Sequence, residues 1–169
     1  MDKETPPYEG RLKRIVLAYM PVAIGGAVAT FAYDVGAHPG SRARDDIVFR
    51  GSPLVPPLLM PVALLGADYL VAKRGPVGIV ATAVMGFVGL GFIGGTTFNL
   101  PNDLDAARAA GSPEWASYLT AAIHLPLGVA LASQSILALR QRRLRAALFA
   151  AEELIHESVR ATSGPQHDT

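Results

Sequence analysis

Four long, almost uncharged apolar segments constrain the fold of this chain more than any other feature. They cover residues 15–35, 54–72, 76–98 and 115–139. Nearly all charged side chains lie outside them, in the tails and the connections. A helix of roughly 20 apolar residues is long enough to cross the hydrocarbon core of a bilayer. The pattern therefore predicts an all-α integral membrane protein, built as a bundle of four transmembrane helices.

The first apolar segment has one alternative interpretation, because it follows Arg11, Lys13 and Arg14 as a secretory signal peptide would. It is longer than the apolar part of such a peptide, and it lacks a clear cleavage site of small residues. Three similar segments follow it. We therefore expect a retained helix, which gives a tail over 1–14, a transmembrane domain over 15–139 and a tail over 140–169.

The basic residues predict how the chain lies in the membrane. The amino-terminal tail, the Lys73-Arg74 turn and the carboxyl-terminal tail hold eleven of the fifteen lysines and arginines. The positive-inside rule therefore places both termini in the cytoplasm, in a multi-pass protein of the cell (plasma) membrane. The basic residues are not interleaved with aromatic side chains, so no nucleic-acid partner is predicted and the expected partner is the lipid bilayer.

Local signals predict where helices begin. Ser52-Pro53 and Ser112-Pro113 each offer a capping serine followed by a proline suited to the first helical position. We expect the second and fourth spans to start there. Pro61 would then lie inside the second span and kink it or open it locally.

Two further helices are predicted outside the apolar segments. Asn102 as a cap and Gly111 as a stop indicate a short helix in the outer loop. Residues 139–160 continue the fourth span as a cytoplasmic amphipathic helix with a basic first half and an acidic second half. Its basic half suits anionic lipid and its acidic half a partner or a second protomer; a solvated extension is the alternative.

Small residues at helical spacing indicate close contacts between membrane helices. Gly91 and Gly95 form a small-xxx-small pair on a second face of the third span, which suits another helix or a second protomer. The sequence thus leaves open a homo-oligomer or a larger membrane complex. The glycines expected to pack helices are Gly26, Gly86, Gly91, Gly95 and Gly128.

Polar side chains at the outer ends of the spans are the candidates for function, because polar groups are costly at membrane depth. They are expected to line one pocket that is open to the outside, although helix ends in membranes are also polar without any such role. The set is Thr30, Tyr33, Asp34, Thr96, Thr97, Asn99 and His124.

His124 is the candidate closest to the bilayer midplane, since it lies nine residues after the interfacial Trp115. That spacing corresponds to roughly 13 Å along a helix. Its imidazole is expected to hydrogen-bond to a threonine or tyrosine, to titrate, or to bind a ligand. No cofactor is predicted; haem held by His124 is the alternative, and it lacks a second histidine at matching depth.

The sequence offers no pattern that supports catalysis. It has no cysteine, no serine–histidine–acid set, no paired intramembrane carboxylates and no metal-binding motif. Three function classes remain open: a non-catalytic membrane subunit or scaffold that packs against partner helices, a small transporter or channel with an outward-facing polar pocket around Asp34 and His124, and an intramembrane enzyme or redox subunit.

Overall fold

The computed structural model describes residues 7–73 and 75–162, and this part of the chain forms α-helices and no β-strand. The helices are α1 (Pro7–Ala32), α2 (Ala43–Asp46), α3 (Leu59–Val71), α4 (Pro76–Ala109) and α5 (Glu114–Thr162). The predicted all-α class is confirmed. Among the described residues, three helices are long and apolar enough to cross a membrane: α1, α4 and α5. This is compatible with a multi-pass membrane protein.

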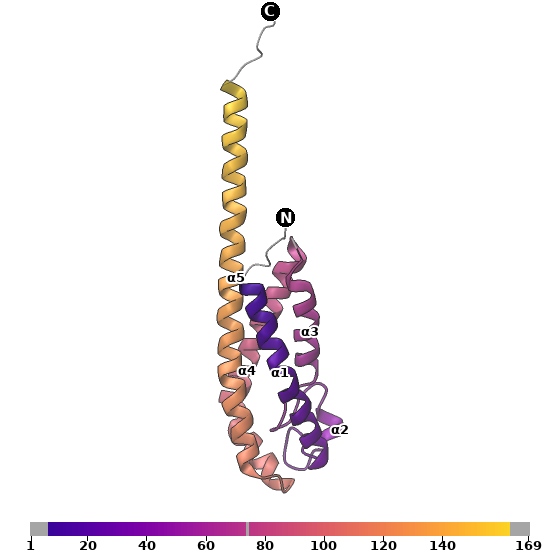
Figure 1. Ribbon diagram of the computed structural model, residues 1–169. Coiled ribbons are helices and arrows are strands. Elements are labelled where there is room, and N and C mark those ends of the chain that lie inside the picture. The colour runs from indigo at the N-terminus through magenta and orange to yellow at the C-terminus, as the bar shows by residue number, and fades with distance from the viewer. Residues whose placement is uncertain (1–6, 74, 163–169) are drawn as a thin grey trace, which may run out of the picture.

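α1, α3, α4 and the first part of α5 lie side by side (Figure 1). α1 packs against α3 and α5, and α4 packs against the same two helices. The amino-terminal end of α1 and the turn between α3 and α4 lie at the end from which the last part of α5 projects (Figure 1). The side chains at the centre of this packing are apolar, and the largest that are fully buried include Leu12, Val16, Leu64, Met85 and Leu131.

Large apolar side chains also cover the outer surface of the packed helices. Ile24 of α1, Tyr69 of α3 and Phe87 of α4 are each more than half exposed. Soluble monomers rarely expose contiguous apolar patches of this kind, whereas hydrocarbon chains accommodate them. The exposed surface therefore agrees with the length and apolar character of the three long helices.

α3 is shorter than the predicted span 54–72, because it begins at Leu59 and has 13 residues. The expected start at Ser52-Pro53 is wrong: the Ser52 and Val55 backbones pair with each other instead. Pro56 and Pro57 disfavour helical backbone at the residue before each of them, so the helix does not extend back through this segment. Pro61 consequently falls in the first turn of α3, where a missing amide leaves no gap in the hydrogen-bond ladder.

α4 is longer than the predicted span 76–98, because it continues through Pro101 for 34 residues. The separate outer-loop helix expected from Asn102 is therefore the last part of α4. The helix ends in a Schellman motif: the Ser112 amide donates to the Ala107 carbonyl and the Gly111 amide to the Arg108 carbonyl. Gly111 takes the left-handed conformation that this motif needs, with a φ of 69°.

α5 is a single helix of 49 residues that joins the predicted fourth span to the predicted amphipathic helix. At 1.5 Å per residue its length is about 73 Å, more than twice the thickness of a hydrocarbon core. Its last part therefore projects beyond the other helices (Figure 1). Ser112 does not cap α5, since its buried hydroxyl has no hydrogen-bond partner in the described structure. An ion pair of 2.8 Å between Arg108 and Glu114 instead joins the end of α4 to the start of α5.

α4 and α5 approach each other closely at two glycines. A Cβ atom on Gly89 would stand 2.8 Å from the Gly128 carbonyl oxygen, and one on Gly128 would stand 2.6 Å from the Gly89 carbonyl oxygen. Neither position has room for a side chain.

The other glycines with a predicted packing role differ in their surroundings. A Cβ on Gly26 would collide with the Leu54 carbonyl oxygen, so α1 lies directly against the loop before α3. A Cβ on Gly86 would stand 3.2 Å from the Ser135 Cβ, and one on Gly91 would stand 3.0 Å from Met60 Cε. Gly95 has no neighbour within 4 Å of that position.

Candidate functional site

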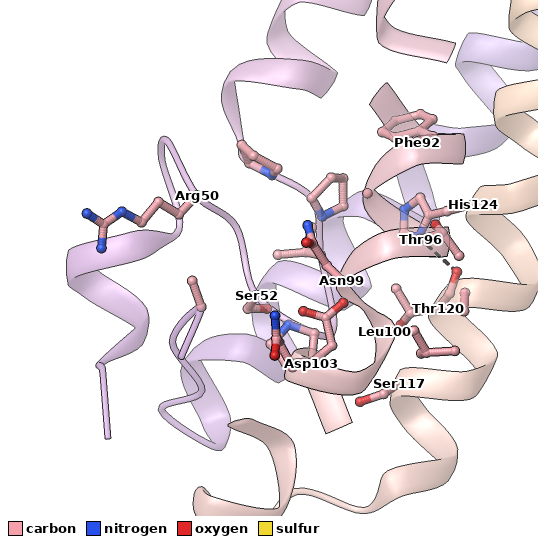
Figure 2. A pocket seen from close by; sticks show the side chains of 18 of the residues that line it. Arg50, Ser52, Phe92, Thr96, Asn99, Leu100, Asp103, Ser117, Thr120 and His124 are labelled. Atoms are coloured by element: carbon pink, nitrogen blue, oxygen red, sulfur yellow. Dashed lines mark hydrogen bonds between the residues drawn. The ribbon is translucent and has the colours of Figure 1, made fainter. Parts of the chain in front are cut away.

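A cavity of about 380 Å³ lies between the α1–α3 loop, the second half of α4 and the first half of α5. Its volume is within the range usual for sites that hold small molecules. Figure 2 shows the side chains that line it. The cavity lies in the half of the molecule opposite the projecting end of α5, which is the half where the sequence predicts an outer pocket.

The α4 wall is formed by polar side chains on one face of the helix. Thr96, Asn99 and Asp103 all line the cavity, at spacings of three and four residues that repeat every turn. Asn102 lies beside them. These residues provide a hydroxyl, two amides and one carboxyl group, so this wall can both donate and accept hydrogen bonds.

The α5 wall follows the same geometry, with Ser117, Thr120 and His124 lining the cavity. The Thr120 hydroxyl donates to the Ala116 carbonyl oxygen at 2.8 Å and is thus already satisfied. The Ser117 side chain is only 1% exposed, and its hydroxyl has no partner in the described structure. A buried hydroxyl without a partner costs free energy, so Ser117 is available for a bound molecule.

His124 forms the inner end of the cavity and is held at both ring nitrogens. Its Nδ1 lies 2.8 Å from the Thr120 carbonyl oxygen, which can only accept, so Nδ1 carries a hydrogen and donates. Its Nε2 lies 3.2 Å from the Tyr19 hydroxyl and accepts from it. These two bonds fit a neutral imidazole. Phe92 packs against both rings, with its centroid 5.1 Å from that of His124 and 5.3 Å from that of Tyr19.

The loop wall is a stretch of non-helical backbone rich in proline. Pro53, Val55, Pro56 and Pro57 line the cavity, and so does Ser52. The Ser52 hydroxyl is hydrogen-bonded to the Thr30 hydroxyl at 2.6 Å, which connects this wall to α1. Since prolines have few conformations, the wall holds its shape without helical hydrogen bonds.

Two carboxylates stabilise the outer loop by accepting hydrogen bonds from its backbone amides. Asp34 accepts a hydrogen bond of 3.0 Å from the Ala43 amide at the start of α2. Asp46, only 3% exposed, accepts one of 2.9 Å from the Ala37 amide and forms an ion pair of 3.3 Å with Arg50. Hydrogen bonds from Ser41 and Ala37, with the nearby Arg50 charge, lower the pKa of Asp46 below its ordinary value.

The lowered pKa predicts how the outer loop responds to acid. A carboxyl group whose pKa is lower in the folded state stabilises that state above its unfolded pKa, near 3.8 for an aspartate. The stabilisation is lost as the pH falls through the folded pKa. We expect Asp46→Ala to cost about 2 kcal/mol at neutral pH and progressively less below pH 4, because buried donors lose a charged acceptor.

Thermal unfolding of the purified protein between pH 3 and 7 measures the effect of Asp46→Ala. The exposed neighbour Asp45→Ala is the matched control and should leave the profile of the parent protein unchanged. A constant difference between Asp46→Ala and the parent across the whole range would contradict this role of the carboxylate.

The structure brings together part of the predicted pocket set. Thr96, Asn99 and His124 line the cavity. Thr30 lies behind the loop wall, bonded to Ser52. The remaining three of the set are not among the lining residues: Tyr33 is 44% exposed, Asp34 binds the start of α2, and Thr97 donates to the Ile93 carbonyl on the exposed side of α4.

Several lining residues were not in the predicted set. Asp103 and Asn102 belong to the part of α4 for which the sequence predicts a separate helix. Ser52 and His38 come from the outer loop. Ser117 lies seven residues before His124, a spacing that places both on one helix face and is visible in the sequence.

No protein-family model, curated protein or solved structure matches this chain. The chemistry of the site therefore rests on its own residues. Among the residues that the structure describes, no group of three or more histidine, aspartate or glutamate side chains is placed to hold a metal ion. A haem iron on His124 would require Nε2 to give up its bond with Tyr19.

Proposed function

We propose that the protein crosses the plasma membrane four times with both termini in the cytoplasm, and that it binds a small polar solute from the outside as a transporter or channel. The observation that carries the proposal is the cavity. Its walls offer hydroxyl, amide, carboxyl and imidazole groups within helices whose outer surfaces are apolar. A polar recess of this size in an apolar protein is costly unless water or a solute fills it.

The non-helical segment before α3 supports this reading. α3 has 13 residues, which at 1.5 Å per residue span about 20 Å and fall short of a hydrocarbon core. The segment 53–58 would complete the crossing, and most of it lines the cavity. Non-helical backbone at membrane depth is tolerated where it lines a water-filled space, and small transporters place their binding sites at such interrupted helices.

Cysteine accessibility tests the proposal directly, because the chain has no cysteine and an introduced thiol is the only one. Asn99→Cys places a thiol in the α4 wall. We expect a membrane-impermeant maleimide added to intact cells to label the Asn99→Cys variant rapidly. Leu148→Cys, in the projecting part of α5, should be labelled only after the membrane is permeabilised.

Gly25→Cys is the matched control for lipid exposure. Gly25 lies in the apolar part of α1 and has no neighbour within 4 Å of a Cβ position, so its thiol should face hydrocarbon and react slowly from either side. If position 99 reacts no faster than position 25 in intact cells, the outward-facing cavity is excluded.

A scaffold that packs against partner helices is the second candidate, and the projecting part of α5 favours it. Leu144, Leu148 and Ile155 are each more than 60% exposed there, at spacings that form one stripe. Copies in one membrane would run parallel, so the same stripes would meet in a second copy of the chain. Absence of outside labelling at position 99, with inside labelling at position 148, would leave this candidate in place of the first.

A further inference from the structure

We propose that the ligand of the cavity is a small organic ammonium ion, held by Asp103 as its counter-ion and by Ser117 and Asn99 as hydrogen-bonding groups. This inference rests on the proposed solute-binding function and deepens it by naming the class of solute.

The charge of the cavity wall favours a cation. The Asp103 carboxylate is half-buried on the α4 wall and makes no ion pair within the described part of the chain. Arg50 lines the rim, but its side chain extends away from the other labelled residues in Figure 2 and pairs with Asp46. His38 is the other basic lining residue, and it comes from the exposed loop. Asp103 is thus the one carboxylate among the lining residues, and both basic lining residues belong to the outer loop, with Arg50 paired to Asp46.

The Ser117 hydroxyl is a second, independent indication that a ligand belongs here. It lines the cavity, is 1% exposed, and has no hydrogen-bond partner in the described structure. Neighbouring hydroxyls on the same walls are satisfied: Thr120 by the Ala116 carbonyl and Ser52 by Thr30. Ser117 can accept a hydrogen bond from an ammonium N–H or exchange one with a hydroxyl on the ligand.

The remaining lining distinguishes an organic cation from a metal ion. Calcium and magnesium need several oxygen ligands with more than one carboxylate in most sites, and this cavity has a single carboxylate. Phe92, Leu100 and Val55 present apolar surface beside the polar groups. An ammonium group with a short hydrocarbon body fits both halves of this lining, with the ammonium beside Asp103 and the hydrocarbon body against the apolar side chains.

Calorimetric titration of the purified full chain tests the charge preference with three probes of one shape. They are butylammonium chloride, its neutral analogue butanol and the anionic sodium butyrate. We expect butylammonium to bind about tenfold or more tightly than butanol, and butyrate not to bind, because only the cation gains from the carboxylate. Butanol binding as tightly as butylammonium, tighter binding of butyrate, or no binding by any probe would overturn the proposal.

Substitutions then assign the preference to Asp103. Asp103→Asn should weaken butylammonium binding about tenfold or more, whereas Asp103→Glu keeps the charge and should retain most of it. Asp105→Asn is the matched control, since Asp105 lies outside the cavity on the same helix and pairs with Arg108. Unchanged binding in Asp103→Asn, or failure of Asp103→Glu to retain binding while it unfolds at the parent temperature, would contradict the assignment.

Ser117→Ala separates a ligand contact from a structural role. It should weaken butylammonium binding several-fold while leaving the unfolding temperature of the free protein equal or higher, because it removes a buried hydroxyl that has no partner. Lower stability with unchanged affinity would contradict the ligand contact. The two proposals can be refuted separately. Labelling at position 99 from outside without ammonium binding would refute the ammonium ligand alone, and absence of labelling would refute both the outward-facing cavity and its ligand.

Discussion

Gly128→Leu should prevent α4 and α5 from packing and leave little folded protein. A Cβ at this position would stand 2.6 Å from the Gly89 carbonyl oxygen, 2.9 Å from Ile93 Cγ1 and 3.0 Å from Phe92 Cβ. The first of these neighbours is backbone of another helix, so relief requires the two helices to separate. We expect a cost of about 3 kcal/mol or more, and Gly128→Ala should cost less because only its Cβ must be accommodated.

The effect of Gly128→Leu extends to the cavity, because Phe92 packs on both the glycine contact and the ring of His124. Unfolding in mixed micelles with increasing dodecyl sulfate measures the stability, and size-exclusion chromatography measures the folded fraction. Gly25→Leu is the control: it has no close neighbour, and replacing a helical glycine with leucine favours the helix by roughly 0.8 kcal/mol. Equal losses for Gly128→Leu and Gly25→Leu would show that the crossing is not close-packed.

Local sequence signals predicted the long helices better than their ends. The length of the apolar segments alone indicates α1, the first part of α4 and the first part of α5, because an apolar run of that length is typical of a membrane-spanning helix. The sequence predicts that the third span ends at residue 98, whereas α4 continues through Pro101, because a proline removes one hydrogen bond from a helix and α4 tolerates that loss. Whether a proline ends a helix depends on the tertiary contacts around it, which the sequence does not display.

The start of α3 shows the same limit. Ser52-Pro53 has the composition of a helix start, yet the loop backbone there makes longer-range bonds. The Leu58 amide donates to the Ile47 carbonyl oxygen at 2.9 Å, and the Leu59 amide to the Val48 carbonyl oxygen at 3.3 Å. These bonds hold the chain beside α2 until Leu59. They join residues about eleven apart, so no motif of adjacent residues predicts them.

The sequence likewise predicts some residues of the candidate site and not others. Helical periodicity places Ser117 and His124 on one face, and the structure keeps both on one wall. Thr96 and Thr97 are neighbours in sequence, but successive helical residues point about 100° apart, so one lines the cavity and the other does not. Asp103 and Ser52 reach the cavity only through the paths of α4 and the outer loop, and these paths depend on how the whole chain packs.

The bond between Tyr19 and His124 should contribute to stability as a coupled pair. Both side chains are buried, and the Tyr19 hydroxyl lies 3.2 Å from His124 Nε2. His124→Phe keeps most of the volume but leaves the tyrosine hydroxyl without its partner, at an expected cost of about 2 kcal/mol. Tyr19→Phe leaves Nε2 without a donor, at about 1 kcal/mol.

The double variant distinguishes this coupling from separate packing effects. When both partners of a buried hydrogen bond become apolar, neither is left unsatisfied, so the double variant should lose about 1 kcal/mol less than the two single variants together. Unfolding in mixed micelles with increasing dodecyl sulfate gives the four stabilities of the cycle. Additive losses would mean that the two groups are satisfied independently, by water in the cavity or by other side chains. A measured coupling would show that the Tyr19 hydroxyl and Nε2 satisfy each other, which fits the neutral imidazole indicated by the Nδ1 bond to the Thr120 carbonyl oxygen.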